Sequence, residues 1–285
     1  MNIEMGYQSS FTNWTVTKVF ENYHSFCEQN YKHINFSYLQ FNDLYDNNPS
    51  GIYSPHLMTI KNLDNGKYII VSYWDNAVGL TWNDCGWDNE NCVGLVTSSG
   101  VFNGLSHTPF SYLPYSSLFT ELSKNAKSMD LKENNELSFR GHLYGDRLDL
   151  ANIGKIKITA DKMFPEDLYF NELTNNKICL SLNGAGEICN RDIEILAAKS
   201  VLLRPMLLQK FHNELIPDHH YIGFEFDADP SIQSDIILDV FEKSKNNHEL
   251  LKCISENGYE WYQKNGTIDA NVDILSKIIN FSILK

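Results

Sequence analysis

The residues best suited to chemistry lie in a glycine-rich turn, NGAGEICNRD, that leads into a helical pattern. Gly184 and Gly186 would let the backbone approach a ligand closely, and a helix start would direct free N–H groups toward an anion. Arg191 could grip a phosphate with its planar guanidinium, and Glu187 could accept hydrogen bonds from sugar hydroxyls. No lysine follows the glycines, so the stretch is not a P-loop. The same sequence is also consistent with an ordinary strand-to-helix turn that carries a surface arginine.

A second turn, FRGHLYGDR, places Arg140 and Arg147 around two glycines. Alone, it could be a turn with solvated charges. Both turns follow expected strands in the same half of the chain, and both carry arginine. Together they suggest a diphosphate held by guanidinium groups and helix ends.

Asp75 ends the most apolar strand in the first half of the chain. A carboxylate facing a cleft there could act as a general base, although the pattern alone favours a turn aspartate that caps the next residues. Trp74 and Trp82 could pack against the C–H face of a sugar or belong to a core. The sequence leaves both alternatives open.

Other patterns exclude several kinds of site. The D-x-D triplet of Asp227 and Asp229 can bind a divalent metal, but its place before a helical run favours helix capping. His219 and His220 are adjacent and would point apart on a strand. There is no CxxC pair, and no GxSxG, HExxH or Walker motif. We therefore expect no metal and no cofactor.

The elements that must position these residues alternate between strands and helices. A polar segment, 130–136, predicts a linker between two units. Such alternation on both sides of a linker predicts an α/β fold with two parallel-sheet domains. We expect strands at 67–75, 92–100, 137–141, 155–161, 177–184 and 200–205, and helices at 11–30, 117–129, 147–154, 165–176, 191–199 and, as a pair, 230–262.

Composition narrows the partners. The chain has 285 residues, 42% of them hydrophobic, and a formal net charge of −13. This charge repels phosphate backbones and argues against a nucleic-acid partner, while leaving room for one small phosphate ligand. Six scattered cysteines suggest reduced thiols. Without a signal-like start or a 20-residue apolar run, we expect a cytoplasmic protein, in the host cytoplasm if viral, with no membrane span.

Three segments share their order and spacing with a known family. FRGHLYGDR, LSLNGAGEICNRDIEILAAKSVLL and IPDHHYIGFEFDADPSIQSDI resemble glycosyltransferase family 90, the CAP10-like group of protein O-glucosyl- and O-xylosyltransferases. The resemblance covers about residues 137–245, and DNGKYIIVSYWDN matches the family more loosely. The spacing before Arg191 is one residue longer than in the family, and the family's secretion and retention signals are absent.

The resemblance implies a GT-B fold, in which two Rossmann-like domains face each other across a cleft. The domains would be 1–133, on the acceptor side, and 134–262, which binds the nucleotide-sugar donor; a helix at 263–285 would cross back. Asp75 would be the catalytic base. The implied donor contacts are Arg140, Gly141, His142, Arg147, Asn183, Gly184, Gly186, Glu187, Arg191 and Glu194, and the acceptor contacts are Trp74, Trp82, Ser98, Ser99 and Tyr112.

The implied activity is that of an inverting, metal-independent hexosyl- or pentosyltransferase. It would move xylose or glucose from a UDP-sugar, which is a co-substrate and not a cofactor, to a hydroxyl of a glycan or protein. Two alternatives stay open: a GT-B transferase with another donor or with retaining chemistry, and a non-catalytic sugar- or nucleotide-binding protein on a degenerate transferase fold.

Overall fold

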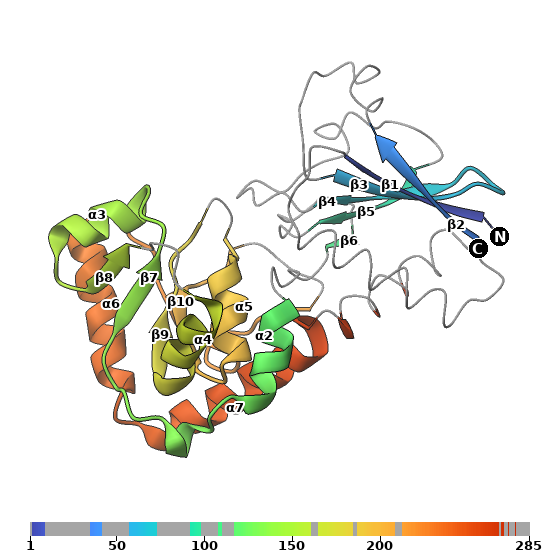
Figure 1. Cartoon of the computed structure of the whole chain (residues 1–285). Helices are drawn as coiled ribbons and strands as arrows, with labels where there is room; N and C mark the ends of the chain where they lie inside the picture. Colours follow the sequence, from blue (N-terminus) through green and yellow to red (C-terminus); the bar gives the residue numbers. More distant parts are fainter. Residues whose placement is uncertain are drawn as a thin grey trace.

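The computed structural model describes two main groups of elements, one from each half of the chain (Figure 1). The described residues are 2–8, 35–41, 57–72, 92–97, 108–109, 117–160, 165–184, 187–208, 213–267, 269–270, 273 and 277. The expected helix 11–30 and most of the expected crossing helix 263–285 lie outside them. The expected domain boundaries therefore stay predictions.

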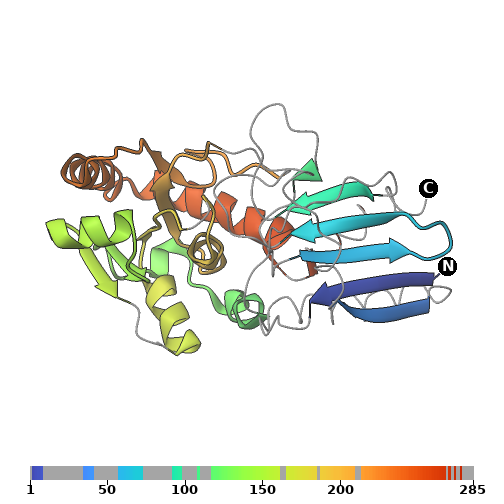
Figure 2. The same ribbon diagram turned by 90° about the horizontal axis from the view of Figure 1, so that it is seen from above.

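A six-stranded sheet comes from the first 109 residues (Figure 2). Its order is β2-β1-β3-β4-β5-β6. β3 runs antiparallel to both β1 and β4, while the other neighbours are parallel. The expectation of a purely parallel sheet is therefore wrong for this half. The strands are β1 (Asn2–Gln8), β2 (Asn35–Phe41), β3 (Leu57–Asn62), β4 (Tyr68–Ser72), β5 (Cys92–Thr97) and β6 (Thr108–Pro109).

The antiparallel pair arises from a tight hairpin between β3 and β4. The backbone N–H of Asn62 donates to the carbonyl of Lys67 at 2.8 Å, and closes the turn. Gly66 has a φ of +76°, a left-handed conformation that glycine adopts without strain. The Asn65–Gly66 pair is a hairpin signal that is present in the sequence itself.

A parallel five-strand arrangement forms the second half. β7 (Ser138–Gly141) pairs with β8 (Lys157–Ala160) and lies beside β9. β9 (Ile178–Leu180), β10 (Val201–Pro205) and β11 (Ile222–Phe224) form a parallel sheet in the order β11-β10-β9. The four strands expected here are confirmed in shorter form.

Helices cover both faces of this sheet, as Figure 1 shows. α3 and α6 pack on one face, and α2, α4 and α5 on the other, while α7 contributes side chains to both cores. The expected helices in this half are confirmed, but the helix expected at 117–129 gives way to two 3₁₀ turns after Leu122. The helices are α2 (Ser117–Leu122), α3 (Asp146–Ile153), α4 (Glu166–Asn175), α5 (Asn190–Ala197), α6 (Pro230–Ser244) and α7 (His248–Asn265).

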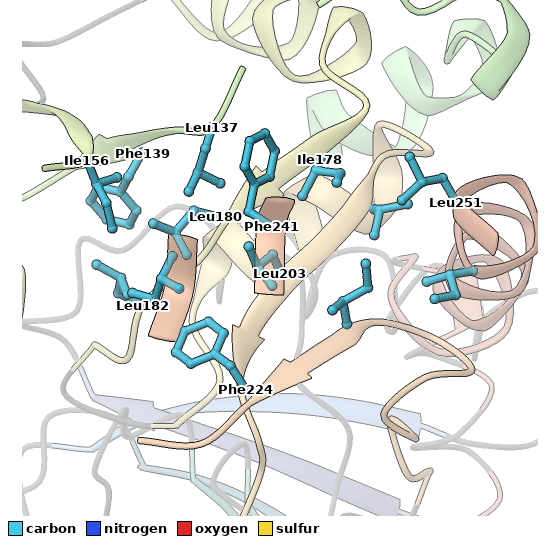
Figure 3. Packing of buried hydrophobic residues seen from close by; sticks show 14 of the residues in the cluster. Leu137, Phe139, Ile156, Ile178, Leu180, Leu182, Leu203, Phe224, Phe241 and Leu251 are labelled. Carbon is cyan, nitrogen blue, oxygen red and sulfur yellow. The ribbon is translucent and has the colours of Figure 1, made fainter. Parts of the chain in front are cut away.

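Strand β10 shows how the sequence builds the two cores. Leu202 joins the cluster beneath α2, α4 and α5, whereas Val201 and Leu203 join the cluster beneath α3 and α6. This is the two-residue alternation of a strand whose faces are both buried. Figure 3 shows Leu203 among Leu180 and Phe224 from the neighbouring strands.

The segment expected to be a linker is instead anchored in the second half. Lys132 is 4% exposed, and its Nζ donates to the carbonyls of Thr174 and Ala198 and to the hydroxyl of Ser200. Phe119 of α2 packs edge-on against Tyr169 of α4. The polar composition suggested a linker. Lys132 is instead buried, because its ammonium group caps the carboxyl ends of α4 and α5.

No helix among the described residues is long and apolar enough to cross a membrane.

His219 and His220 lie in a turn and not on a strand. Their rings meet edge to face, with the ring centroids 4.5 Å apart. The expectation that they point apart is therefore wrong.

Candidate functional site

An open pocket lies at the carboxyl ends of β9, β10 and β11. Its walls are apolar: Leu182 follows β9, Pro205 ends β10, Phe224 ends β11, and Leu150 comes from α3. Phe226 also lines it and is 53% exposed, so a large aromatic face is open to a ligand. Open α/β sheets bind ligands at this edge, because strands end and helices begin there.

The polar lining of the pocket is neutral or acidic. Asn183 and Gln233 bring amides, and Asp146 and Asp227 bring carboxylates. The side chain of Gln233 is held in place, because its Oε1 accepts the backbone N–H of Asp227 at 2.7 Å. Amides suit hydrogen-bonding edges, and carboxylates suit neighbouring hydroxyls. No arginine or lysine is among the described lining residues.

Arg204 lies directly behind this lining, at the end of β10. It is 1% exposed, and its Nη2 donates to the carbonyl of Glu187 at 2.7 Å and to Oδ1 of Asn183 at 3.3 Å. One guanidinium therefore contacts both described ends of the glycine-rich turn. Its Nη1 forms an ion pair with Asp192 at 2.9 Å.

Arg147 supports the same turn from the side of α3. Its Nη2 donates to the carbonyl of Leu182 at 2.8 Å, and its guanidinium lies over the rings of Phe139 and Tyr144. A side chain added at Gly184 would lie 3.2 Å from the Tyr144 hydroxyl and 3.4 Å from Arg147 Nη2. A larger residue would therefore fit here only if the Tyr144 side chain moved by a few tenths of an ångström.

Arg191 is buried beneath the sheet edge. Its Nε donates to the carbonyl of Leu180 at 2.7 Å, and its Nη1 donates to the carbonyl of Arg140 at 3.0 Å and to the Tyr169 hydroxyl at 2.7 Å. These bonds join β7, β9 and α4. The guanidinium therefore contacts protein groups in this structure, and its expected role as a phosphate ligand stays a prediction.

Arg140 is the most exposed arginine of the two turns. Its side chain is 20% exposed and forms a 2.9 Å ion pair with Glu172 through Nε. It follows Phe139, whose ring lies so close to Gly141 that an added Cβ would sit 3.0 Å from it. His142 is exposed, and its carbonyl accepts from Arg147 Nη1 at 3.4 Å.

The start of α5 is capped from within the protein. The backbone N–H of Cys189 donates to Oδ2 of Asp192 at 2.7 Å, completing a capping box. Burial raises the pKa of the Cys189 thiol to about 12, and the nearby Asp192 carboxylate is the second cause of this rise. The thiol therefore stays protonated. A carboxylate thus occupies the helix start where the sequence suggested a phosphate.

The two glutamates expected at the donor site differ in their surroundings. The carboxylate of Glu187 accepts the backbone N–H of Leu208 at 3.1 Å. Glu194 is half-buried on α5 beside Arg191 and Tyr169. Burial raises the pKa of Glu194 to about 7, although Arg191 and a hydrogen bond from Tyr169 oppose the rise. Glu194 can therefore change protonation near neutral pH.

The D-x-D triplet performs capping, as expected. Asp229 accepts the backbone N–H groups of Ser231 at 2.8 Å and of Ile232 at 3.2 Å at the start of α6, and Asp227 accepts the N–H of Asp229 at 2.8 Å. In the part of the chain that the structure describes, no group of three His, Cys, Asp or Glu side chains could hold a metal ion.

Several expected site residues lie outside the described residues. Asp75 comes three residues after β4 ends at Ser72. The others are Gly186 in the glycine-rich turn and the acceptor-side set of Trp74, Trp82, Ser98, Ser99 and Tyr112.

Sequence reasoning missed Arg204 and most of the pocket lining. An arginine inside the apolar run SVLLRP signals a buried charge, which requires a partner. The only cue to Phe226 and Gln233 is their place after a strand, because nothing in their types points to a ligand.

Comparison of structures places this fold among glycosyltransferases. An α-glucosyltransferase in complex with UDP and a 13-mer DNA matches with a TM-score of 0.55 and 10% identity, over 98% of this chain and 100% of its own. A glycosyltransferase from Rickettsia africae matches with a TM-score of 0.52 and 11% identity, over 99% of this chain and 98% of its own. The chain therefore has an α/β fold of the GT-B type.

No protein-family model and no curated protein sequence matches this chain. The resemblance to glycosyltransferase family 90 therefore stays a prediction. At identities of 10% and 11%, the structural likeness concerns the fold alone.

Proposed function

We propose that this protein is a glycosyltransferase that uses a UDP-sugar as donor. The observation that carries the proposal is the pocket at the carboxyl edge of β9–β11, in a fold shared with an α-glucosyltransferase that binds UDP. In such folds this edge receives nucleotides. Glucose or xylose is the proposed sugar, and a hydroxyl of a glycan or protein is the proposed acceptor.

The chemistry of the pocket suits the nucleoside half of such a donor. Phe226 and Leu182 offer apolar surface to a base, and the amide of Asn183 can meet its polar edge. The Asp227 carboxylate can accept hydrogen bonds from ribose hydroxyls. The diphosphate would lie outside this acidic lining, toward β7, where Arg140 is partly exposed.

Transfer then needs charge stabilisation and a base. As the sugar leaves, negative charge grows on the diphosphate, and a cation such as Arg140 would stabilise it without a metal. Asp75 would take the proton of the acceptor hydroxyl, whose oxygen attacks the anomeric carbon. One in-line attack inverts that carbon.

Retention is the second candidate, and a specific observation favours it. The matched enzyme with UDP-glucose bound is an α-glucosyltransferase, and its TM-score is 0.50 at 8% identity. UDP-glucose is itself an α-glucoside, so an α-product keeps the configuration. NMR of the product anomer distinguishes the two chemistries.

The acceptor panel includes DNA. The matched α-glucosyltransferases are bound to DNA, whereas a net charge of −13 argues against a nucleic-acid partner for this chain. We propose a glycan or protein acceptor, and sugar transfer to DNA would overturn that part.

The test begins with thermal shifts in UDP, GDP and CDP, followed by hydrolysis of UDP-glucose and UDP-xylose. We expect UDP to raise the Tm most and a UDP-sugar to be turned over, with no loss in EDTA. Binding without turnover, even when acceptors are supplied, would favour the non-catalytic alternative. The absence of any nucleotide shift would contradict the proposal.

A further inference from the structure

Arg204 joins the pocket lining to the structure behind it. Its Nη2 contacts Asn183 and the carbonyl of Glu187, and its Nε donates to the carbonyl of Pro205 at 3.0 Å. Asn183 and Pro205 both line the pocket. Arg204 itself is 1% exposed and is not among the lining residues, so it can affect a ligand only through these neighbours.

Asp192 fixes the position of Arg204. The two side chains are each 1% exposed and lie 2.9 Å apart. Asp192 is in turn held by the backbone N–H of Cys189 at 2.7 Å, at the start of α5. The guanidinium is thus fixed between α5 and the end of β10, and its Nη2 remains directed at the glycine-rich turn.

We propose that Arg204 is a positioning residue for the donor, because it holds Asn183 and the backbone at Glu187 in the geometry that the pocket requires. This inference rests on the proposed function, since the donor is the ligand of the same pocket. Neither Arg204 nor Asp192 would touch the donor.

The choice of residue types supports a role in geometry. A buried ion pair is costly to desolvate and can often be replaced by apolar groups without loss of stability. A planar guanidinium, however, can pair with Asp192 while a second nitrogen reaches Asn183 and Glu187, which a lysine ammonium cannot do in the same plane. Arg204, held by its ion pair with Asp192, therefore provides directed hydrogen bonds to Asn183 and Glu187 that apolar packing would not.

The experiment compares Arg204 with a buried cation at the other end of the same strand. Lys132 is 4% exposed and donates to Ser200, the residue before β10. It lies away from the pocket lining, so Lys132→Met should lower stability and leave the affinity for UDP unchanged. The test variants are Arg204→Lys and the neutral double variant Asp192→Asn/Arg204→Met, in which the amide oxygen introduced in place of the Asp192 carboxylate can still accept the Cys189 N–H.

Two readouts are measured on folded variants, checked by circular dichroism and a cooperative melt. The first is the Kd of UDP by calorimetry, which we expect to rise about tenfold in both Arg204 variants, a change of about 1.4 kcal/mol. The second is the amide spectrum without ligand. We expect shifts at Asn183, Gly184 and Ile188 in the Arg204 variants, and not in Lys132→Met.

The outcomes separate this inference from the proposed function. Wild-type affinity for UDP in a folded Arg204 variant would overturn the inference while leaving the proposed function standing. Failure of the wild-type protein to bind UDP would overturn the proposed function, and the amide shifts would then decide whether Arg204 shapes the turn. If the amide signals of Asn183 and Gly184 had the same positions in the Arg204 variants as in the wild type, the inference would be overturned in either case. If Arg204→Lys does not fold, the neutral double variant gives the same comparison.

Discussion

Arg204 and Asp192 form a buried ion pair, with Nη1 of the arginine 2.9 Å from Oδ2 of the aspartate and each side chain 1% exposed. The pair links the end of β10 to the first turn of α5, and Asp192 also accepts the N–H of Cys189. Charge pairing and helix capping thus depend on one carboxylate.

Replacing that carboxylate should be strongly destabilising. Asp192→Ala leaves Arg204 charged and buried without its partner, so we expect the free energy of unfolding to fall by about 3–5 kcal/mol. Asp239→Ala is the matched control, because Asp239 pairs with Lys243 on the surface of α6 at 57% exposure and should change stability by at most about 0.5 kcal/mol. Urea unfolding of both variants measures the difference. Equal effects would contradict the importance of the buried pair.

Glu194 should make stability depend on pH. Its folded pKa is about 7, against an ordinary value of 4.5, so the folded protein holds a proton that the unfolded chain releases. This contribution is complete below pH 4.5 and is lost as the pH rises toward 7. Glu194→Gln cannot lose that proton, so at pH 8 it should be more stable than wild type by about 3 kcal/mol.

The advantage of Glu194→Gln should shrink as the pH falls to 5, and chemical denaturation at several pH values checks this. Glu256→Gln, a change at an exposed position of α7, is the control and should show no such trend. A pH-independent difference for Glu194→Gln would place the cause in packing and not in titration.

Much of the second half of the fold could be predicted, because its apolar runs are separated by strong breaks. Strands such as VLLRP are buried on both faces, and Pro165 and the Asp229–Pro230 pair mark helix starts. The linker prediction failed at Lys132, because composition cannot distinguish a solvated lysine from one that caps two helices in a core.

The candidate site could be located but not assembled from sequence. The rule that ligands bind at the carboxyl ends of strands led to Asn183 and its turn, which do border the pocket. The direction of each arginine could not be inferred, because Arg191 and Arg147 satisfy backbone carbonyls that only the folded chain brings near.

Gly258 should be intolerant of a side chain. A Cβ at this position in α7 would lie 2.8 Å from the carbonyl oxygen of His220 and 2.8 Å from Leu196 Cδ2 of α5. The backbone oxygen cannot turn away, so Gly258→Ala should lower stability by about 1–3 kcal/mol despite its better helix propensity. Glu256→Ala, at an exposed position of the same helix, should stay within about 0.5 kcal/mol of wild type in thermal unfolding.

Asp75 is the predicted base, and its test also addresses the stereochemistry. Asp75→Asn removes the proton acceptor at nearly constant shape, so kcat/KM should fall by roughly 10² to 10⁴ while the Kd of UDP is unchanged. Asp64→Asn is the control, because Asp64 is an exposed residue of the hairpin at the opposite end of β4 and should keep full activity.

With UDP-glucose as donor, inversion by a single base gives a β-configured product, which the anomeric NMR coupling identifies. An α-product would require either two successive displacements at the anomeric carbon or attack on the same face as the departing diphosphate. Asp75 would then no longer be needed as the base of a single in-line attack. Full activity in Asp75→Asn together with an α-product would therefore replace the inverting proposal with the retaining one and leave the donor site unaffected.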